Sequence, residues 1–398
     1  MENASSRRHV VIFALITALC LLGDSMLYIV LPMHYAEAGL SSLWEVGIIL
    51  SVNRLIRLPL NPFIGYIYKY ISERTGIILA VFLATLTTVL YGIADSFALW
   101  VLARIVWGLA WTLLRLGSLF CILRVATDNN RGQLNGLYNG LYRLGSLVGM
   151  LVGGILADIA DLPTTAFVFG VLTALAIIPS LRYIPKGSGE YHEHSTSLAE
   201  GFRAMRATRF SLQLVITGGI IAFATQGVIA STLSPLIDNH TGGSLQLFGL
   251  ALGATSLAGL FQALRYGWEP FLAPYVGALA DKRFGWIHML GWSLITAAVF
   301  FLLLSLRLPL PFWFACIIGL QLSATSLTTL SETAASATAA TNGGRALLMQ
   351  YALIVDVGAA LGPITAYAVT DLFGVNAIYI LSGGFFFMYG LLWLRSRP

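Results

Sequence analysis

The stretch GIILAVFLATLTTVLYGIA, Gly76 to Ala94, contains no charged residue and shows no alternation of polar and apolar positions. An apolar run of about 20 residues has the length needed to cross about 30 Å of hydrocarbon as an α-helix. A membrane β-barrel would instead require shorter segments in which apolar and polar residues alternate. The stretch therefore predicts a membrane-spanning helix.

Apolar runs of this kind recur along the whole chain of 398 residues, of which 57% are hydrophobic and 10% are charged. Soluble domains carry about 25% charged residues. The first run contains Asp24 and is too long for the apolar region of a signal peptide, so we interpret it as a retained helix. The sequence predicts an all-α membrane protein with twelve transmembrane helices, at about 10–33, 44–68, 75–95, 97–122, 132–160, 164–183, 210–236, 246–280, 286–306, 309–335, 345–371 and 374–394.

Lysine and arginine concentrate on one side of these spans when the N-terminus is placed in the cytoplasm, as the positive-inside rule requires. Sixteen of the 23 then fall in cytoplasmic segments, six fall within spans, and Arg307 falls in an outer loop. We expect a multi-pass protein of the inner (cytoplasmic) membrane with both termini in the cytoplasm. The net charge of +5 follows from this topology and does not indicate nucleic acid as a partner.

The two halves of the chain resemble each other. A shift of 212 residues places Pro62 on Pro274 and Gly65 on Gly277. We predict two pseudo-symmetric six-helix bundles, residues 1–183 and 210–398, joined by a cytoplasmic linker at 184–209 with a short amphipathic helix near Leu198–Met205. Parallel six-helix repeats with a site at their interface are the architecture of one large class of transporters.

Four signatures are similar to those of the major facilitator superfamily. The loop after the eighth predicted span reads GALADKRFG (Gly277–Gly285), and the loop after the second reads GYIYKYISERTG (Gly65–Gly76), with Lys69 at the acidic position. The fourth span contains RIVWGLAW from Arg104. The fifth contains GLYNGLYRLGSLVGMLVGG (Gly136–Gly154), which has the glycine spacing of antiporters in this superfamily but a methionine, Met150, where proline is usual. The chain is identified as a member across its full length.

The resemblance implies gating or structural roles for the signature residues Arg104, Gly149, Gly153, Gly277, Asp281 and Arg283. Small residues also let membrane helices pack closely, so the glycines have a structural explanation as well. Asp281 lies at a predicted helix end. There a carboxylate can bind a neighbouring helix N-terminus or an arginine in one conformational state only, as a cytoplasmic latch.

The stretch LSVNRLIRLPLNP, Leu50 to Pro62, places polar residues inside a predicted span. At 100° per residue, four of them fall within one arc of about 100°: Asn53, Arg54, Arg57 and Asn61. This arc faces protein or water, because a charge at the centre of a membrane helix costs about 2.5–3.5 kcal/mol. Asp24 lies at a similar depth, by the helical rise of about 1.5 Å per residue, and we expect it to pair with Arg54 or Arg57.

The 212-residue shift places Arg265 on Asn53 and Glu269 on Arg57, and Asp356 lies deep in the eleventh span. The predicted substrate- and proton-binding residues are therefore Asp24, Asn53, Arg54, Arg57, Asn61, Arg265, Glu269 and Asp356. Arg265 and Glu269 are four residues apart and could equally form an ion pair along their own helix. Arg115 and Arg143 are explained as well by fold-holding ion pairs or by snorkelling.

All six histidines lie near span ends or in loops, so a proton carrier at depth would be Asp24, Glu269 or Asp356. A carboxylate that exchanges an arginine partner for a proton can couple proton flow to solute flow. We expect a secondary active transporter that works by alternating access, through proton-coupled efflux of a drug or of an anionic or zwitterionic metabolite. The alternative is a proton-coupled importer or facilitator of an organic anion or sugar.

Other classes of protein are disfavoured. A membrane enzyme would need a nucleophile–base pair or a metal cluster at depth, and neither is visible in the sequence. A receptor or scaffold would be expected to carry an added soluble domain. Cys20, Cys121 and Cys316 fall singly in three predicted helices, without the spacing of a disulfide framework or a zinc site. We expect no metal and no cofactor, and a monomer whose partners are a small-molecule substrate, protons and the lipid bilayer.

Overall fold

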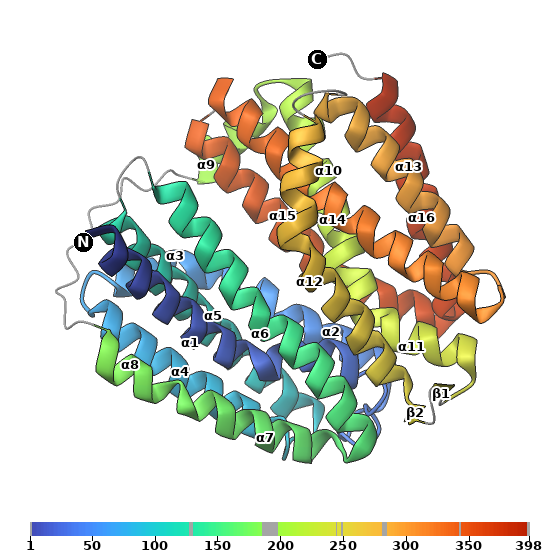
Figure 1. Ribbon diagram of the computed structural model, residues 1–398, viewed down its shortest axis with the longest axis horizontal. Coiled ribbons are helices and arrows are strands. Elements are labelled where there is room, and N and C mark those ends of the chain that lie inside the picture. The colour runs from blue at the N-terminus through green and yellow to red at the C-terminus, as the bar shows by residue number, and fades with distance from the viewer. Residues whose placement is uncertain are drawn as a thin grey trace. The chain divides into compact units, whose positions relative to one another are not determined.

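The structure is a computed structural model that describes residues 2–126, 130–184, 198–243, 245–247, 250–280, 285–341 and 344–395. These residues are almost entirely helical (Figure 1). The helices of the first half are α1 (Glu2–Val30), α2 (Leu43–Leu55), α3 (Arg57–Ile67), α4 (Glu73–Leu90), α5 (Phe97–Val125), α6 (Arg131–Ile159), α7 (Leu162–Leu175) and α8 (Ile177–Tyr183).

The second half begins with the amphipathic helix α9 (Leu198–Arg206), which confirms the helix predicted near Leu198–Met205. The remaining elements are α10 (Arg209–Ala222), the π-helix η1 (Phe223–Val228), α11 (Ile229–Thr241), α12 (Ala254–Leu279), α13 (Trp286–Leu304), α14 (Leu310–Thr341), α15 (Gly344–Phe373) and α16 (Val375–Arg395). Between α11 and α12, the short strands β1 (Leu245–Leu247) and β2 (Leu250–Leu252) pair antiparallel, with Leu245 opposite Leu252.

The prediction of a multi-pass helical membrane protein is confirmed. Within the described residues, ten helical stretches are long and apolar enough to cross a membrane. Of the twelve predicted spans, the two not among these ten are 44–68 and 246–280. The first is divided between α2 and α3, each shorter than a full span, and the second corresponds to α12, whose middle carries Gln262, Arg265 and Glu269.

Side-chain caps fix where several helices begin. Ser42 accepts a hydrogen bond from the backbone N–H of Glu45 and so starts α2, and Thr208 does the same for α10 through Ser211. Asp161 caps α7 by accepting a hydrogen bond from the backbone N–H of Thr164 over 2.6 Å. Hydrogen bonds from the backbone and the side chain of Thr164 lower the pKa of the exposed Asp161 carboxyl. Each cap satisfies one of the N–H groups that a helix N-terminus leaves unpaired.

The break between α2 and α3 lies at Ile56, which forms a turn between the two helices. Pro59 is the cause suggested by the sequence, since it has no N–H to donate to the carbonyl four residues earlier, at Leu55. The Ile56 N–H still bonds to the carbonyl of Val52 at 2.9 Å, and the Leu60 N–H bonds to Ile56 at 3.2 Å. The polar stretch identified in the sequence is thus carried on two short helical segments.

Close backbone contacts join α1 to α6, which lie side by side (Figure 1). A Cβ atom added at Gly145 would lie 2.1 Å from the carbonyl oxygen of Ala18, so only glycine fits there. The same pattern occurs between η1 and α15, where a Cβ on Gly362 would lie 2.4 Å from the Cα of Gly227. The seventh and eleventh predicted spans therefore pack as the first and fifth do, in agreement with the internal repeat.

The chain groups into two compact units. Unit 1 comprises Met1–Glu193 and Gly243–Tyr266, and unit 2 comprises His194–Gly242 and Gly267–Pro398. The helix α12 contributes its first half to unit 1 and its second half to unit 2. The domain boundaries at 184–209 stay a prediction.

Candidate functional site

A buried ion pair lies in unit 1. Arg104 of α5 donates from Nη1 to Oδ1 of Asp24 on α1 over 2.5 Å. Arg104 is 0% exposed and Asp24 is 7% exposed. Two charges taken so far out of water are stable only while they stay together and their remaining polar atoms are satisfied.

Besides Asp24, two neighbours hold the guanidinium of Arg104 in place. Its Nε donates to the backbone carbonyl of Ile49 over 3.2 Å, and its Nη1 also donates to the hydroxyl of Tyr91 over 3.2 Å. The ring of Tyr91 in turn stacks on Trp100, with ring centroids 5.4 Å apart. Ile49 of α2 and Tyr91, the residue that follows α4, therefore direct the charged end of Arg104 toward Asp24.

Asn53 of α2 completes the surroundings of Asp24. Its Nδ2 donates to Asp24 Oδ1 over 3.2 Å, and the side chain is 0% exposed. Within the described residues, Oδ1 of Asn53 and Nη2 of Arg104 are buried and have no hydrogen-bond partner. Since buried polar atoms are normally bonded, an acceptor and a donor left open beside one carboxylate indicate a place for a further polar atom, such as a water oxygen.

The arginine that the structure pairs with Asp24 is Arg104, whereas the sequence led us to expect Arg54 or Arg57 as its partner. Arg54 instead donates from Nε to the hydroxyl of Tyr28 over 3.3 Å. A depth estimate on α5 would have found the partner. Arg104 is about 10 Å from the helix start at Phe97, and Asp24 is about 9 Å from the end of α1.

Arg57 is the first residue of α3 and is 9% exposed. Its guanidinium lies over the ring of Trp111 on α5, with Cζ 5.0 Å from the ring centroid. Asn61, one turn further along α3, is exposed. Of the four residues in the predicted polar arc, Asn53 and Arg57 are thus the deeply buried ones.

A group of aromatic and arginine side chains next to Arg57 was not predicted as a site. Trp111 meets Tyr142 edge-to-face with centroids 5.8 Å apart, and Tyr142 packs on Tyr138 at 5.1 Å. Arg115 lies over both tyrosine rings, 5.4 Å from Tyr138 and 5.7 Å from Tyr142. We name Arg57, Trp111, Arg115, Tyr138 and Tyr142 the aromatic–guanidinium cluster. Its sequence signal is the spacing of Arg104, Trp111 and Arg115, which places them within about 40° on one face of α5.

The predicted residues of the second half are distributed over both units. Arg265 is buried in the part of α12 that belongs to unit 1. Glu269 lies in the other part of α12, and Asp356 lies on α15; both are half-buried and belong to unit 2. Their roles stay predictions.

Apart from Arg104, the signature residues divide into three groups. Gly149 and Gly153 pack against α1, where added Cβ atoms would lie 2.6 Å from the carbonyl oxygen of Leu22 and 2.6 Å from the Cβ of Met26. Gly277 has open space around its Cα. Asp281 and Arg283 lie outside the described residues, so their predicted gating role is not tested.

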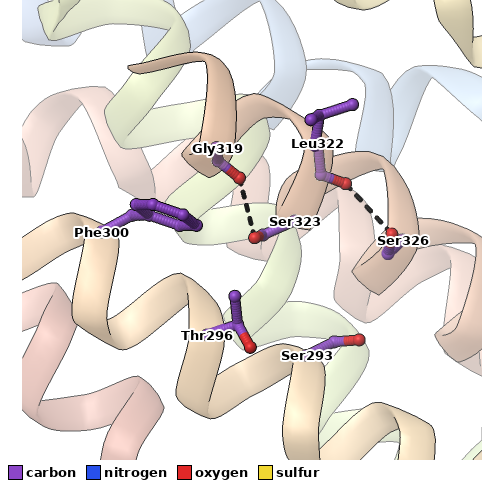
Figure 2. Close-up of a pocket in the computed structure, with 7 residues that line it drawn as sticks. All are labelled: Ser293, Thr296, Phe300, Gly319, Leu322, Ser323 and Ser326. Atoms are coloured by element: carbon purple, nitrogen blue, oxygen red, sulfur yellow. Dashed lines mark hydrogen bonds between the residues drawn. The ribbon is translucent and has the colours of Figure 1, made fainter. Parts of the chain in front are cut away.

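A pocket of about 300 Å³ lies in unit 2, between α13 and α14 (Figure 2). The pocket is lined by Ser293, Thr296, Phe300, Gly319, Leu322, Ser323 and Ser326. The hydroxyls of Ser323 and Ser326 donate to carbonyls of their own helix, at 2.8 and 3.1 Å. Its lining has no charged group, so the pocket is chemically unlike the ion-pair site of unit 1, and we base the functional argument on the latter.

The sequence matches the family described as Major Facilitator Superfamily over residues 13–268. The chain belongs to this superfamily. The match includes every residue of the Asp24–Arg104 site and of the aromatic–guanidinium cluster. No curated protein matches the sequence.

Solved structures of the superfamily's fold cover nearly the whole chain. A bacterial homologue of the human lysosomal transporter Spinster, inward-facing and unoccupied, is 16% identical with a TM-score of 0.74, over 99% of this chain and 98% of that chain. The nucleoside transporter NupG is 13% identical with a TM-score of 0.78, over 98% and 100%. A POT family transporter in complex with a thioalcohol-conjugated peptide is 12% identical with a TM-score of 0.77, over 97% and 95%. At such identities the likeness shows a shared transporter fold, and the substrates belong to those proteins.

The candidate site of this member of the superfamily is built from charged side chains. Within the described part of the chain, no group of three or more histidine, cysteine or carboxylate side chains could hold a metal ion. Among the described residues of unit 1, Asp24 is a buried carboxylate whose arginine partner has further N–H donors. Such a pair can exchange a proton or an anionic group while both side chains stay where their helices hold them.

Proposed function

We propose that this protein is a proton-coupled secondary transporter that exports a small anionic or zwitterionic organic solute, with Asp24 as the proton carrier. The observation that carries the proposal is the buried Asp24–Arg104 pair with Asn53 bonded to the same carboxylate oxygen. A merely structural pair would be expected to have all its polar atoms satisfied. Here two atoms beside the carboxylate, Asn53 Oδ1 and Arg104 Nη2, have no hydrogen-bond partner among the residues that the structure describes.

Protonation of Asp24 would change the local charge by one unit at a buried position. The pair is neutral while Asp24 is ionised; once Asp24 is protonated, the charge of Arg104 has lost its partner. An unbalanced buried charge is unstable, so the protein is driven either to expose the site or to bind an anion there. Proton arrival is thereby linked to a change in conformation or in substrate affinity, and the linkage is reciprocal.

Orientation and location follow the distribution of lysine and arginine. We infer a place in the inner (cytoplasmic) membrane with both termini in the cytoplasm, and a monomer as the working unit. Efflux is supported by the glycine spacing in α6, similar to that of antiporters, with Gly145 and Gly149 packed on α1.

The alternative is proton-coupled import of an organic anion. The same balance of charge favours import. A protonated Asp24 leaves the charge of Arg104 without its partner, so Arg104 would bind an anion. Proton and substrate would then bind together. Antiport requires the opposite, since proton and substrate compete. Substrate affinity from about pH 5.5 to about pH 8.5 separates the two: affinity that rises as pH falls supports symport and contradicts antiport.

Transport by the full chain in proteoliposomes tests the proposal. Flux of radiolabelled aromatic carboxylates, aliphatic carboxylates and amino acids is measured with and without a pH gradient. We expect Asp24→Asn to abolish the response to the gradient, because an amide cannot carry the proton. The control is Asp95→Asn, an exposed carboxylate in the loop between α4 and α5. An unchanged response in Asp24→Asn would exclude this residue as the proton carrier.

A further inference from the structure

Trp111 of the aromatic–guanidinium cluster lies at the middle of α5. Trp111 is 14 residues from both ends of α5, which runs from Phe97 to Val125. It is about 10 Å further along the helix axis than Arg104, by the rise of about 1.5 Å per residue. Arg115 is one turn beyond Trp111 on the same face. The face of α5 that carries Arg104 of the proton site therefore also carries an aromatic ring and a second arginine, further along the helix toward Val125.

The side chains of this cluster are partly accessible. Arg115 is exposed, and Trp111 and Tyr142 are half-buried, while Tyr138 is buried. An exposed guanidinium within a membrane helix must face protein or a water-filled path, because lipid would destabilise it. Accessible rings beside it provide the apolar surface that small-molecule sites combine with a few fixed polar groups.

Cation–π contacts hold the two guanidinium groups of the cluster beside aromatic rings. Arg57 is held over Trp111, and Arg115 is held over Tyr138 and Tyr142 and donates from Nη1 to Asn139 Oδ1 over 2.9 Å. Arginine carries its N–H donors in one planar fork, and its side chain can stay in contact with an aromatic ring while the fork binds another group. Such a fork binds a carboxylate through two hydrogen bonds.

We propose that the aromatic–guanidinium cluster binds the substrate, and that the substrate is an aromatic organic anion, in particular an aromatic carboxylate. The rings of Trp111 and Tyr142 contact the substrate ring, and Arg115 and Arg57 hold its anionic group. This assignment rests on the proposed transport function. It separates the substrate site from the proton site at Asp24 by about two helical turns of α5.

Binding of 2-naphthoate to the purified full chain in detergent tests this assignment, with tryptophan fluorescence and thermal shift as readouts. We expect wild-type protein to bind 2-naphthoate, to bind 2-naphthamide at least about tenfold more weakly, and to bind cyclohexanecarboxylate more weakly as well. Loss of a charge-assisted hydrogen bond gives differences of this size. Absence of 2-naphthoate binding, or equal affinity for the acid and its amide, would overturn the assignment.

Variants on α5 locate the site. Arg115→Gln should weaken 2-naphthoate binding about tenfold or more, with Arg115→Lys in between, because lysine keeps the charge but loses the planar fork. Trp111→Leu should weaken binding more than Trp111→Phe, which retains a ring. The matched control on the same helix is Arg124→Gln. Arg124 forms an ion pair with Glu73 at 2.9 Å, so this variant should lower thermal stability without changing affinity.

A purely structural role of the cluster predicts another result. Arg115→Gln would then lower the melting temperature like Arg124→Gln and leave 2-naphthoate affinity unchanged, which would overturn the proposal. The proton site is tested separately, since Asp24→Asn should remove the response of transport to a pH gradient. One possible result is that Arg115→Gln weakens 2-naphthoate binding while Asp24→Asn leaves the response of transport to a pH gradient unchanged. This result would support the substrate site and reject Asp24 as the proton carrier. The reverse result would reject the substrate site alone.

Discussion

The carboxylate of Asp158, near the end of α6, accepts a hydrogen bond of 2.9 Å from the backbone N–H of Ser256 in the first turn of α12. The hydroxyl of Thr255 donates to the other oxygen of the same carboxylate. Gly253, just before α12, leaves room for this carboxylate, since an added Cβ would lie 2.4 Å from it. A side chain about a hundred residues away in sequence thus caps the N-terminus of α12, where negative charge is favoured.

Asp158→Ala should weaken the start of α12. Removing a capping carboxylate lowers the free energy of unfolding by about 0.5–2 kcal/mol, and the Ser256 amide should exchange its hydrogen faster. Hydrogen exchange of the peptide that contains Ser256 measures this effect. Asp161→Ala is the matched control, because Asp161 caps α7 and its loss should affect Thr164 instead. Equal exchange at Ser256 in wild type and Asp158→Ala would show that the cap is unimportant.

Gly145→Ala should destabilise the α1–α6 contact. The new Cβ would collide with the carbonyl oxygen of Ala18, and overpacking of this kind costs about 1–3 kcal/mol. Gly140→Ala on the same helix has nothing within 4 Å of its Cβ and should be neutral or stabilising. Thermal unfolding in detergent compares the two. A similar melting temperature for both variants would contradict the close approach of the helices.

The stability of the ion pair can be tested by a double-mutant cycle. Arg104→Gln leaves Asp24 buried without its charged partner and should lower the free energy of unfolding by about 3–5 kcal/mol. Adding Asp24→Asn removes the second charge, so the double variant should be more stable than Arg104→Gln alone. Thermal unfolding of the two single variants and the double variant measures the coupling. Additive effects would mean that the two side chains do not interact.

Asp281→Asn should slow turnover and leave substrate affinity nearly unchanged, as expected of a residue that stabilises one conformation. Lys69→Ala, at the corresponding position of the first half, should have a smaller effect because the acid is already absent there. Initial transport rates and binding constants for both variants decide this. A large change in affinity at a normal rate in Asp281→Asn would point to substrate contact rather than to gating.

Much of the fold could be predicted from the sequence, because membrane helices are set by length and apolarity. The polar arc on the second span was also visible, since Asn53 and Arg57 are out of place in lipid. The pairing of Asp24 with Arg104 does not follow from the polar arc, because Arg104 lies on another helix, within a signature of the superfamily. The aromatic–guanidinium cluster is not evident in the sequence for another reason. Tryptophan and tyrosine are common in membrane helices, and only the contacts of Trp111 and Tyr142 in the structure distinguish these two residues from the others.

The break at Ile56 separates a residue of the proton site from a residue of the proposed substrate site, so protonation and substrate binding can occur one after the other. Asn53, which bonds to Asp24, lies in the last turn of α2, and Arg57, which lies over Trp111, is the first residue of α3. The covalent path between them is only three residues long, Arg54, Leu55 and Ile56. A rotation of a few degrees at this joint would move one side chain relative to the other without breaking either helix. A change in the φ and ψ angles of Ile56 alone would thereby let protonation precede substrate binding, or follow it.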